Sequence, residues 1–291
     1  MLRLAVATNE ETLERMRSPL EDRGIEAEHV RTRERTLPVT DTDAAGEFAG
    51  FDVGFVYPPR IMEGGIADAL LSVPWVNDRE AILTSRNKAD VLARLHRAGV
   101  PVPDTVAVSN PADRSDLVAA FERFEPPVVV KPNSATRGVG VAKATDVDSF
   151  LGITDYLDLV HDYRATGDRS FLVQEYLPAA RDYRVMVVDG EYAGAVERRL
   201  PDPAVEAGQW KHNVHRGAEA TGVELPTELR DLAERTAETL GIPWLGVDLL
   251  VTDDRAVVTE TNARPTIDSE SKYGPAFYDD LAALIRRTAG V

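Results

Sequence analysis

Residues 246–266, GVDLLVTDDRAVVTETNARPT, constrain the fold most, because their pattern predicts a β-hairpin with a polar face. The runs GVDLLV and AVVTETN are apolar and β-branched, and TDDR between them is typical of a turn. Side chains alternate across a strand, so Glu260 and Asn262 share one face. Asp248 lies opposite Glu260 if the loop has three or five residues. A two-residue loop would shift the register by one and turn Asp248 to the other face.

The three oxygen-bearing side chains of this hairpin suit a magnesium site. Two carboxylates and an amide oxygen are hard ligands, typical of a cation that keeps part of its water and also contacts phosphates. Asp and Glu make up 49 of the 291 residues, so a chance meeting of carboxylates is the competing interpretation. The rest of the chain has to decide between the two.

Composition excludes several classes of protein. A net charge of −16 argues against nucleic acid as a partner, because binding a phosphate backbone needs a basic surface. No apolar run approaches the about 20 residues of a membrane span. The opening MLRLAVATN has no apolar core of a signal peptide, so we expect a cytoplasmic protein with no membrane partner. The absence of cysteine excludes disulfides, thiolate metal sites and cysteine nucleophiles.

The surplus of carboxylates, with 28 arginines and only five lysines, is typical of adaptation to high salt, and we expect a halophilic protein. A position that keeps lysine in such a chain can require a compact ammonium group on a flexible stem. The five are Lys88, Lys131, Lys143, Lys211 and Lys272. Three of them fall inside the motifs described below.

Residues 1–85 predict a small α/β unit. Strand patterns at 2–8, 26–31, 51–59 and 73–78 alternate with helix patterns at 9–25 and 64–73, and the polar stretch 36–49 predicts a loop. Such alternation favours a parallel sheet. No G-x-G-x-x-G follows the first strand, so a dinucleotide site is not indicated.

The middle of the chain predicts a phosphate-binding loop. A helix at 86–99 is followed by an extended Pro-rich stretch at 100–105 and a second helix at 111–124. A strand at 128–130 then ends at Lys131, and a glycine-rich loop at 133–140 leads into a strand at 141–144. Gly138 and Gly140 permit a tight turn whose amides, with Lys131, can hold phosphates. There is no Walker motif, and a plain hairpin turn is the alternative.

The second half of the chain predicts strands rich in charged side chains. A helix and linker at 146–167 precede a buried strand at 171–178, which carries Gln174 and Glu175. A hairpin at 181–200 turns at Asp189–Gly190. A loop over 201–209 leads to WKHNVHRGAEA, whose polar side chains also suit a solvated loop. Amphipathic helices at 227–242 and 272–290 flank the opening hairpin.

The order of these motifs resembles the ATP-grasp superfamily and, within it, the RimK-like carboxylate–amine ligases that add glutamate or similar amino acids. The motifs that carry the resemblance are NKADVLARLHRAGVPVPDT, VVVKPNSATRGVGV, VQEYLP with DYRVMVV, ERRL with KHNVHRGA, and GVDLLV with ETNARP. The resemblance implies an α/β ATP-grasp fold of α+β lobes with an N-terminal Rossmann-like domain. The implied units are the N-terminal domain at 1–85, a central lobe at 86–170, and a C-terminal lobe at 171–291 with the metal and substrate site.

The resemblance also assigns site residues. Those implied to bind ATP are Lys88, Lys131, Ser134, Gly138, Gly140, Gln174, Glu175, Tyr176, Leu177, Asp182, Lys211 and Asn213. Those implied to hold two Mg²⁺ ions, or Mn²⁺, are Asp248, Glu260 and Asn262. Those implied to act on the transferred phosphate or the substrate carboxylate are Arg184, Arg198, Asn213 and Arg264. The chain departs from the family pattern at Asn133-Ser134-Ala135 and at Arg264, which puts the acceptor in doubt but not ATP.

The implied reaction makes an amide bond through an acyl phosphate, from an amino acid and a carboxylate-bearing cofactor or protein tail. His212 and His215 are candidate bases by position only, and a surface or hydrogen-bonded histidine is the alternative. Two rival functions stay open: a small-molecule kinase on the same scaffold, and a nucleotide-binding regulatory module without turnover. The Asp248, Glu260 and Asn262 set argues against the second rival. Oligomeric state is open, with a homo-oligomer as one expectation.

Overall fold

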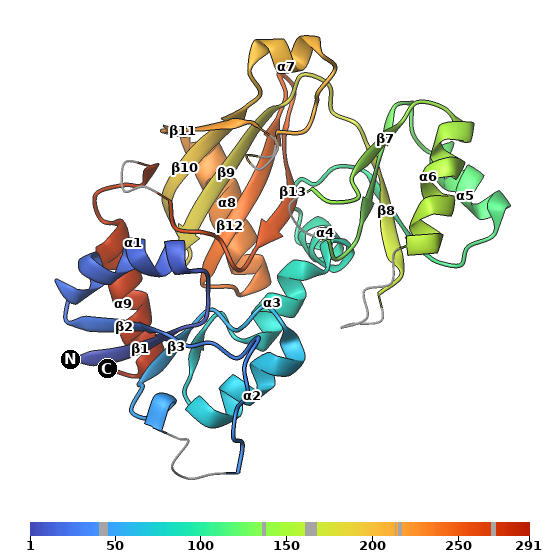
Figure 1. Cartoon of the computed structure of the whole chain (residues 1–291). Coiled ribbons are helices and arrows are strands. Elements are labelled where there is room, and N and C mark those ends of the chain that lie inside the picture. Colours follow the sequence, from blue (N-terminus) through green and yellow to red (C-terminus); the bar gives the residue numbers. More distant parts are fainter. Residues whose placement is uncertain (41–45, 136–137, 161–167, 213, 215–216, 269–271) are drawn as a thin grey trace.

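The structure is a computed structural model that describes residues 1–40, 46–135, 138–160, 168–212, 214, 217–268 and 272–291. Three sheets with their helices form three lobes (Figure 1). Within the described residues, no helix has both the length and the apolar character needed to cross a membrane.

The N-terminal sheet is parallel, as the alternation predicts. Its strands are β1 (Leu2–Val6), β2 (Ile25–His29), β3 (Val53–Phe55) and β4 (Trp75–Val76), in the order β2-β1-β3-β4. Helix α1 (Glu10–Glu21) packs on β2, and α2 (Ile61–Leu71) precedes β4. The C-terminal helix α9 (Phe277–Ala289) packs against β3, β4 and β9, so both chain ends lie in this lobe (Figure 1).

Two short helices connect this lobe to the rest. They are α3 (Arg79–Arg86) and α4 (Lys88–Arg97). The sequence predicts only the second of them. Asp78 and Asn87 each accept a hydrogen bond from a backbone amide three residues on, at Ala81 and Asp90, so two N-caps divide the segment.

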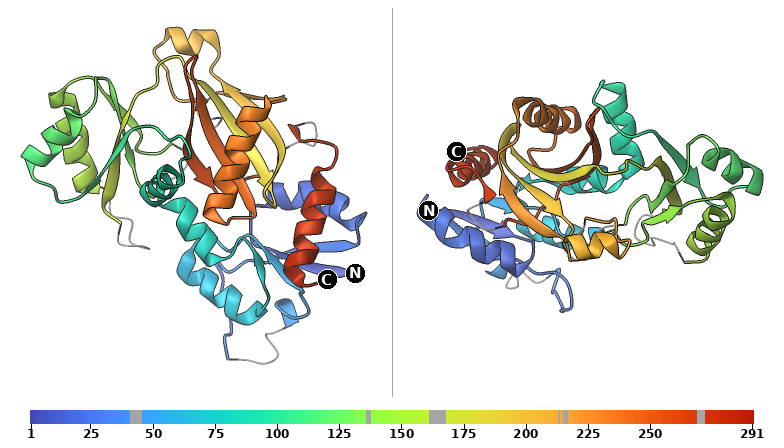
Figure 2. Two further views of the ribbon diagram at one scale, coloured as in Figure 1. Left: turned by 180° about the vertical axis from the view of Figure 1, so that it is seen from behind. Right: turned by 90° about the horizontal axis from the view of Figure 1, so that it is seen from above.

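The central sheet is antiparallel, in the order β5-β8-β6-β7. Its strands are β5 (Thr105–Ser109), β6 (Val128–Pro132), β7 (Ala142–Ala144) and β8 (Ser170–Glu175). Helices α5 (Arg114–Phe121) and α6 (Val147–Val160) cover its outer face (Figure 2). The predicted boundary between the central and C-terminal lobes, after residue 170, would separate most of β8 from β5 and β6, although all three strands belong to this sheet.

The C-terminal sheet has five strands in the order β11-β10-β9-β12-β13. They are β9 (Arg181–Val188), β10 (Glu191–Arg199), β11 (Glu219–Val223), β12 (Trp244–Val251) and β13 (Ala256–Asn262). Helix α8 (Thr227–Leu240) packs behind it, and α7 (Asp202–Glu206) follows β10. Helix α7 lies in the stretch 201–209 that the sequence predicts as loop, and β11 begins at the end of the polar stretch WKHNVHRGAEA.

The hydrophobic core is divided differently from the sheets. One continuous core joins the N-terminal lobe, α9 and the C-terminal sheet, and Trp244 lies at its centre with its ring 5.8 Å from Phe55 and 5.9 Å from Phe277. The central lobe has a separate core around Phe121 and Phe150. Two lobes therefore share one packed interior, and the third packs by itself.

In the β12–β13 hairpin, Asp248 and Glu260 face each other as expected for a shared site, but the loop does not have either of the lengths expected to produce this pairing. Asp248 lies opposite Glu260 and Gly246 opposite Asn262. The loop is neither three nor five residues long, because pairing ends at Val251 and Ala256 and four residues connect them. The register shifts by one between Asp248 and Leu249, which inserts Thr259 as an extra residue. This bulge restores the facing pair that a four-residue loop alone would lose.

Candidate functional site

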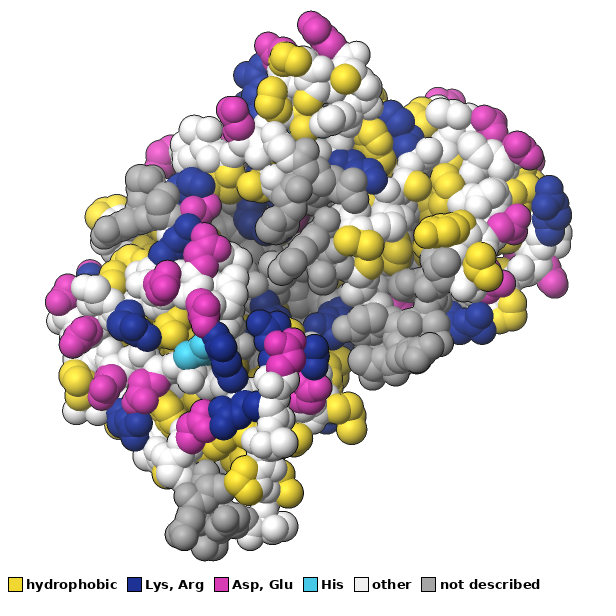
Figure 3. Space-filling view, in the orientation of Figure 1, with side chains coloured by type: hydrophobic (Ala, Val, Ile, Leu, Met, Phe, Trp, Pro, Cys, Tyr) yellow, Lys and Arg dark blue, Asp and Glu magenta, His cyan; other side chains and the backbone are white. Residues whose placement is uncertain are grey.

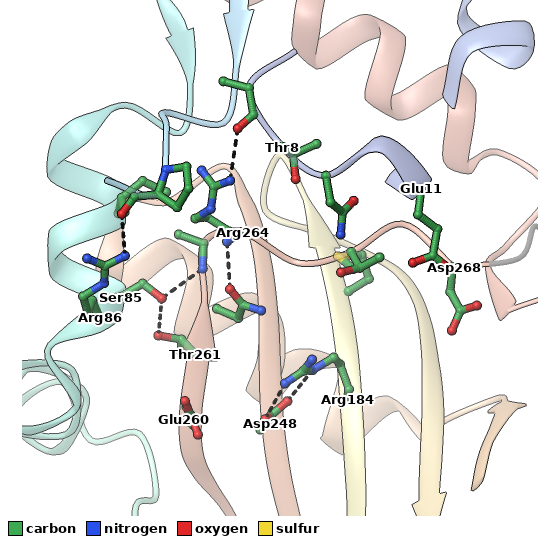
Figure 4. A pocket seen from close by; sticks show the side chains of 18 of the residues that line it. Thr8, Glu11, Ser85, Arg86, Arg184, Asp248, Glu260, Thr261, Arg264 and Asp268 are labelled. Atoms are coloured by element: carbon green, nitrogen blue, oxygen red, sulfur yellow. Dashed lines mark hydrogen bonds and ion pairs between the residues drawn. The ribbon is translucent and has the colours of Figure 1, made fainter. Parts of the chain in front are cut away.

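Asp248 is the most enclosed of the predicted metal ligands, at 6% exposed. Arg184 on β9 grips its carboxylate with two bonds, Nε to Oδ1 at 2.7 Å and Nη2 to Oδ2 at 2.8 Å (Figure 4). Arg198 on β10 lies 3.2 Å from Oδ2. Burial alone would raise the pKa of Asp248, but the two arginines outweigh it and hold the pKa at about 2.

Arg198 also holds Asp182, which the resemblance implies to bind ATP. Its Nε and Nη2 lie 2.8 and 2.5 Å from Asp182 Oδ1. Burial raises the pKa of Asp182 although Arg198 opposes the shift, and the two carboxylates raise the pKa of Arg198 against its burial. Arg184, Arg198, Asp182 and Asp248 thus form one network of ion pairs, in which Arg198 contacts both carboxylates.

Glu260 and two lysines form the other half of the metal face. Lys88 Nζ lies 3.2 Å from Glu260 Oε1 and donates to Ala135 O at 2.5 Å, at the start of the glycine-rich loop. Lys131 Nζ donates to Thr259 O at 3.3 Å. Burial lowers the pKa of Lys131 to about 8, with Lys88 adding to the shift and Glu260 opposing it. The two lysines reach the hairpin from α4 and β6.

The donor chemistry fits Mg²⁺. Asp248 and Glu260 supply carboxylates, and the amide oxygen of Asn262 accepts a bond from Arg264 N at 2.9 Å while keeping a second lone pair. No group of three or more His, Cys, Asp or Glu side chains within the described ranges forms a complete metal cage. An incomplete set of oxygen ligands is what Mg²⁺ takes when phosphate and water supply the remainder.

The glycine-rich loop is described except at positions 136 and 137. Gly138 and Gly140 have φ of 67° and 75°, a region that favours glycine. A Cβ on Gly140 would lie 2.6 Å from Pro132 Cγ, so the loop folds tightly onto the end of β6. Ser134 donates to Asp168 Oδ2 at 2.6 Å, which ties the loop to the segment before β8.

Gln174 and Glu175, with the backbone just after them, are the residues that the resemblance implies to meet the adenine of ATP, and both side chains have partners within the protein. Gln174 Nε2 donates to Thr105 Oγ1 at 2.7 Å. Glu175 accepts from Asp104 N at 2.8 Å and pairs with Arg255 at 2.5 Å, so it joins the central lobe to the β12–β13 turn. The backbone of Tyr176 and Leu177, just past the end of β8, remains the predicted contact for a base.

Tyr176, Trp210 and Lys143 form a cluster next to the end of β8. The two rings meet edge to face at 5.9 Å, and Lys143 Nζ lies 4.8 and 5.4 Å from the two ring centres. Lys143 is opposite Val129 on β6, which puts it on the same face as Lys131. Sequence reasoning does not assign Lys143 or Trp210, although the scarcity of lysine is a signal for the first.

The stretch KHNVHRGA, which carries Lys211 and Asn213, is described only in part. Lys211 donates to Val141 O, beside the glycine-rich loop. His212 Nδ1 lies 2.9 Å from Arg198 O, so this candidate base has a backbone partner at one nitrogen. Asn213 and His215 lie outside the described residues.

Arg264 binds carbonyl groups of the N-terminal lobe. Its guanidinium donates to Tyr57 O and, at 3.1 Å, to Ala7 O, just past β3 and β1 (Figure 4). Burial and two neighbouring cations, Arg86 and Arg33, lower its pKa to about 10. These contacts show a role in joining β13 to the N-terminal lobe. A role toward a substrate carboxylate stays a prediction.

A cavity of about 900 Å³ lies between the metal hairpin and the N-terminal lobe. Lys and Arg side chains gather on the N-terminal side of this hollow (Figure 3). In the described part of the chain, ten Lys and Arg residues line the cavity against five Asp and Glu, although the whole chain carries −16. The cations that come from the N-terminal lobe and α3 are Arg15, Arg31, Arg33, Arg60 and Arg86. Sequence reasoning did not select them, because single arginines in loops carry no local pattern.

Known proteins resemble this chain in both sequence and architecture. The model of the RimK-like ATP-grasp domain matches residues 85–282. A protein named probable alpha-L-glutamate ligase, from Klebsiella pneumoniae, is 32% identical over 224 residues, which are 74% of this chain and 68% of that protein. The ribosomal protein bS6–L-glutamate ligase of Salmonella paratyphi B is 32% identical over 206 residues, covering 68% of this chain and 62% of its own length.

Solved structures agree on the fold. A RimK domain ATP-grasp protein from Sphaerobacter thermophilus gives a TM-score of 0.67 at 23% identity, over 99% of this chain and all of that one. The D-alanine–D-alanine ligase of Bacillus anthracis gives 0.70 at 17% identity, over 99% and 97% of the two chains. The predicted ATP-grasp fold is thereby confirmed. The chain belongs to the RimK-like ATP-grasp family, whose members are ligases that form C–N bonds.

Proposed function

We propose that this protein is an ATP-dependent ligase that joins glutamate or a similar amino acid to a carboxylate-bearing acceptor. The observation that carries the proposal is that the arginine-lined cavity opens onto Asp248 and Glu260. A phosphate held at the hairpin and an acceptor carboxylate held in the cavity would meet there. The names of two relatives, probable alpha-L-glutamate ligase and ribosomal protein bS6–L-glutamate ligase, support the choice of amino acid.

In the first step, an oxygen of the acceptor carboxylate attacks the γ-phosphorus, and the bond to the ADP oxygen breaks. The amine then attacks the acyl carbon, phosphate leaves, and the amine loses a proton to a base that is not assigned. Two Mg²⁺ or Mn²⁺ ions on Asp248, Glu260 and Asn262 would supply charge neutralisation for the transferred group. Lys88 and Lys131 are placed to hold the phosphates, and Arg184 and Arg198 to keep Asp248 ionised.

The charge of the cavity supports an acidic acceptor. Arg33 has no carboxylate within ion-pair distance among the described residues, and Arg264 contacts only carbonyl groups there. A substrate with several carboxylates would supply the missing negative charge. Acidic cofactors and acidic protein tails both meet this requirement.

A screen of ADP release tests the proposal. Purified protein with ATP and Mg²⁺ is mixed with each amino acid and with acceptors such as tetraglutamate or tetraalanine, and products are identified by mass spectrometry. We expect release that depends on both an amino acid and an acidic acceptor. A stable phosphoester formed without an amine would instead identify a kinase.

Glu260→Gln is the matched variant. It keeps the shape of the side chain but loses a metal-binding charge. We expect turnover to fall by more than the about 10- to 100-fold that loss of an outer-shell partner costs a metal site, with ATP binding still measurable. Glu238→Gln, on the exposed face of α8, is the control and should keep wild-type turnover. Full turnover in Glu260→Gln would remove the metal proposal.

A further inference from the structure

The metal hairpin contains two registers, and only one of them builds the site. Near the turn, Val251 lies opposite Ala256, whereas at the open end Asp248 lies opposite Glu260, one residue out of step. If the turn register continued to the open end, Asp248 would face Thr259. Glu260 would then point to the opposite face of the sheet. Something at the open end must therefore hold the second register.

The side chain of Asn77 clips the open end of this hairpin. Its Nδ2 donates to Trp244 O at 2.5 Å and to Ala263 O at 2.7 Å, and its Oδ1 accepts from Trp244 N at 3.2 Å. Trp244 begins β12 and Ala263 follows the last residue of β13. One amide thus joins the strand of Asp248 to the strand of Glu260 and Asn262.

Asn77 is itself held firmly. It is 1% exposed, has a φ of 59°, and its carbonyl accepts from Tyr57 N at 3.0 Å at the end of β3. Asparagine is one of the few residues that adopts this left-handed conformation readily. The backbone of Asn77 is therefore attached to the N-terminal sheet, while its side chain binds the hairpin.

Ser85 on α3 adds a second attachment. Its hydroxyl lies 3.1 Å from Thr261 Oγ1 and accepts from Ala263 N at 3.0 Å, and both Ser85 and Thr261 are buried. A one-residue slip of β13 would turn Thr261 away from Ser85. The contact is therefore compatible with only one of the two registers.

We propose that Asn77 and Ser85 are positioning residues that select the register in which Asp248 and Glu260 share a face. The inference rests on the proposed metal role of the hairpin. It makes the N-terminal lobe part of the metal site, although none of its side chains is a proposed ligand. Buried polar groups that fix register in this way are well attested in other folds.

The test measures metal binding instead of turnover. The full chain is titrated with Mn²⁺ in the presence of a non-hydrolysable ATP analogue, and free Mn²⁺ is followed by electron paramagnetic resonance. Asn77→Gly keeps the left-handed backbone and removes the clip, while Asn77→Asp keeps the shape and replaces two donors by an acceptor. We expect both to weaken Mn²⁺ binding by about 10- to 100-fold, as for other groups behind metal ligands. Affinity for the analogue in EDTA should change less than two-fold.

Ser85→Ala covers the case in which the Asn77 variants do not fold. We expect a loss of about three- to ten-fold in Mn²⁺ affinity, the equivalent of one hydrogen bond. Amide exchange should also become faster in the segment around Ala263. Thr236→Val is the control, because it removes a buried bond of 2.7 Å to Leu232 O on α8 behind the same sheet. It should leave Mn²⁺ affinity within two-fold of wild type.

The outcomes separate the inference from the function on which it rests. If Glu260→Gln weakens Mn²⁺ binding and the Asn77 and Ser85 variants behave like Thr236→Val, the register role is refuted and the metal site stands. If Glu260→Gln binds Mn²⁺ as wild type does, the metal site is refuted and the register role falls with it.

Discussion

The hairpin side of the site, proposed to bind nucleotide (the nucleotide half), and the N-terminal side of the cavity, proposed to bind the acceptor (the acceptor half), differ in how their charges are balanced. On the nucleotide side, Arg184 and Arg198 are matched by Asp248 and Asp182, and Lys88 is matched by Glu260. On the acceptor side, Arg15, Arg31 and Arg60 pair with carboxylates. Arg33 and Arg264, in contrast, have no carboxylate partner among the described residues. The first half pairs both of its arginines with carboxylates of the chain, whereas the second keeps two arginines that contact no carboxylate among the described residues.

The difference indicates that the nucleotide half is preorganised for its ligand, whereas the acceptor half attracts its ligand by charge. A balanced network fixes side chains before ligand arrives, because each group already has a partner. An excess of cations raises the local concentration of anions and costs electrostatic energy until one binds. Changes in the first half should therefore alter metal and nucleotide handling, and changes in the second should alter only the acceptor.

The largest expected effect among these tests lies on the nucleotide side, at Lys131. Its pKa of about 8 is well below the usual 10.5, so the ammonium loses its proton as pH rises from 7 to 9. Phosphate binds the protonated form better, and we expect ATP affinity to fall by up to about ten-fold over this range. Calorimetric titration with ATP and Mg²⁺ at fixed ionic strength measures it.

Lys131→Met provides the control for this pH dependence. It should bind ATP weakly at every pH, with no fall between pH 7 and 9. A wild-type protein whose ATP affinity is flat over this range would show that Lys131 does not titrate there.

A smaller effect is expected on the acceptor side from Arg33→Glu. Reversing a charge at the cavity mouth should raise the KM for an acidic acceptor by about five-fold, and leave the KM for ATP unchanged. Arg17→Glu, an exposed site on α1 outside the cavity, makes the same change in net charge and should have no effect. Equal effects of the two variants would mean that overall charge, and not the cavity, selects the substrate.

The smallest expected effect is that of salt, which should act in opposite ways on the stability of the chain and on binding of an acidic acceptor in the cavity. Raising KCl from 0.1 to about 2 M screens the self-repulsion of a chain with net charge −16, so the unfolding midpoint should rise by a few degrees. The same salt should raise the KM for an acidic acceptor. A midpoint that does not respond to molar KCl would contradict adaptation to high salt.

Much of the nucleotide half could be predicted, because its residues lie in local patterns. Lys131 ends a strand before a glycine-rich loop, and alternation places Glu260 and Asn262 on one face. The hairpin register came out as predicted only because the bulge at Thr259 compensates for the loop length. Neither the alternation of side chains nor the turn residues of this hairpin predict that bulge.

Contacts between distant segments could not be predicted in either half, because these side chains meet only through tertiary structure. Asn77 lies in the strand predicted at 73–78, directly before the helix cap Asp78, yet its amide contacts residues more than 160 positions away. Arg264 was expected to face a substrate, and its carbonyl partners follow two strands that the sequence does not place beside it. Glu175 pairs with Arg255 for the same reason, across two lobes.

The shared core has a consequence for how the chain folds. Phe55 and Phe277 both pack on Trp244, so the first lobe shares its interior with a strand and a helix from the last fifth of the sequence. Contacts between such distant segments form late and slow folding. The central lobe, with its own core, can fold as a unit while the first lobe waits for the C-terminal helix. On a ribosome, the middle of this protein would therefore be finished before its beginning.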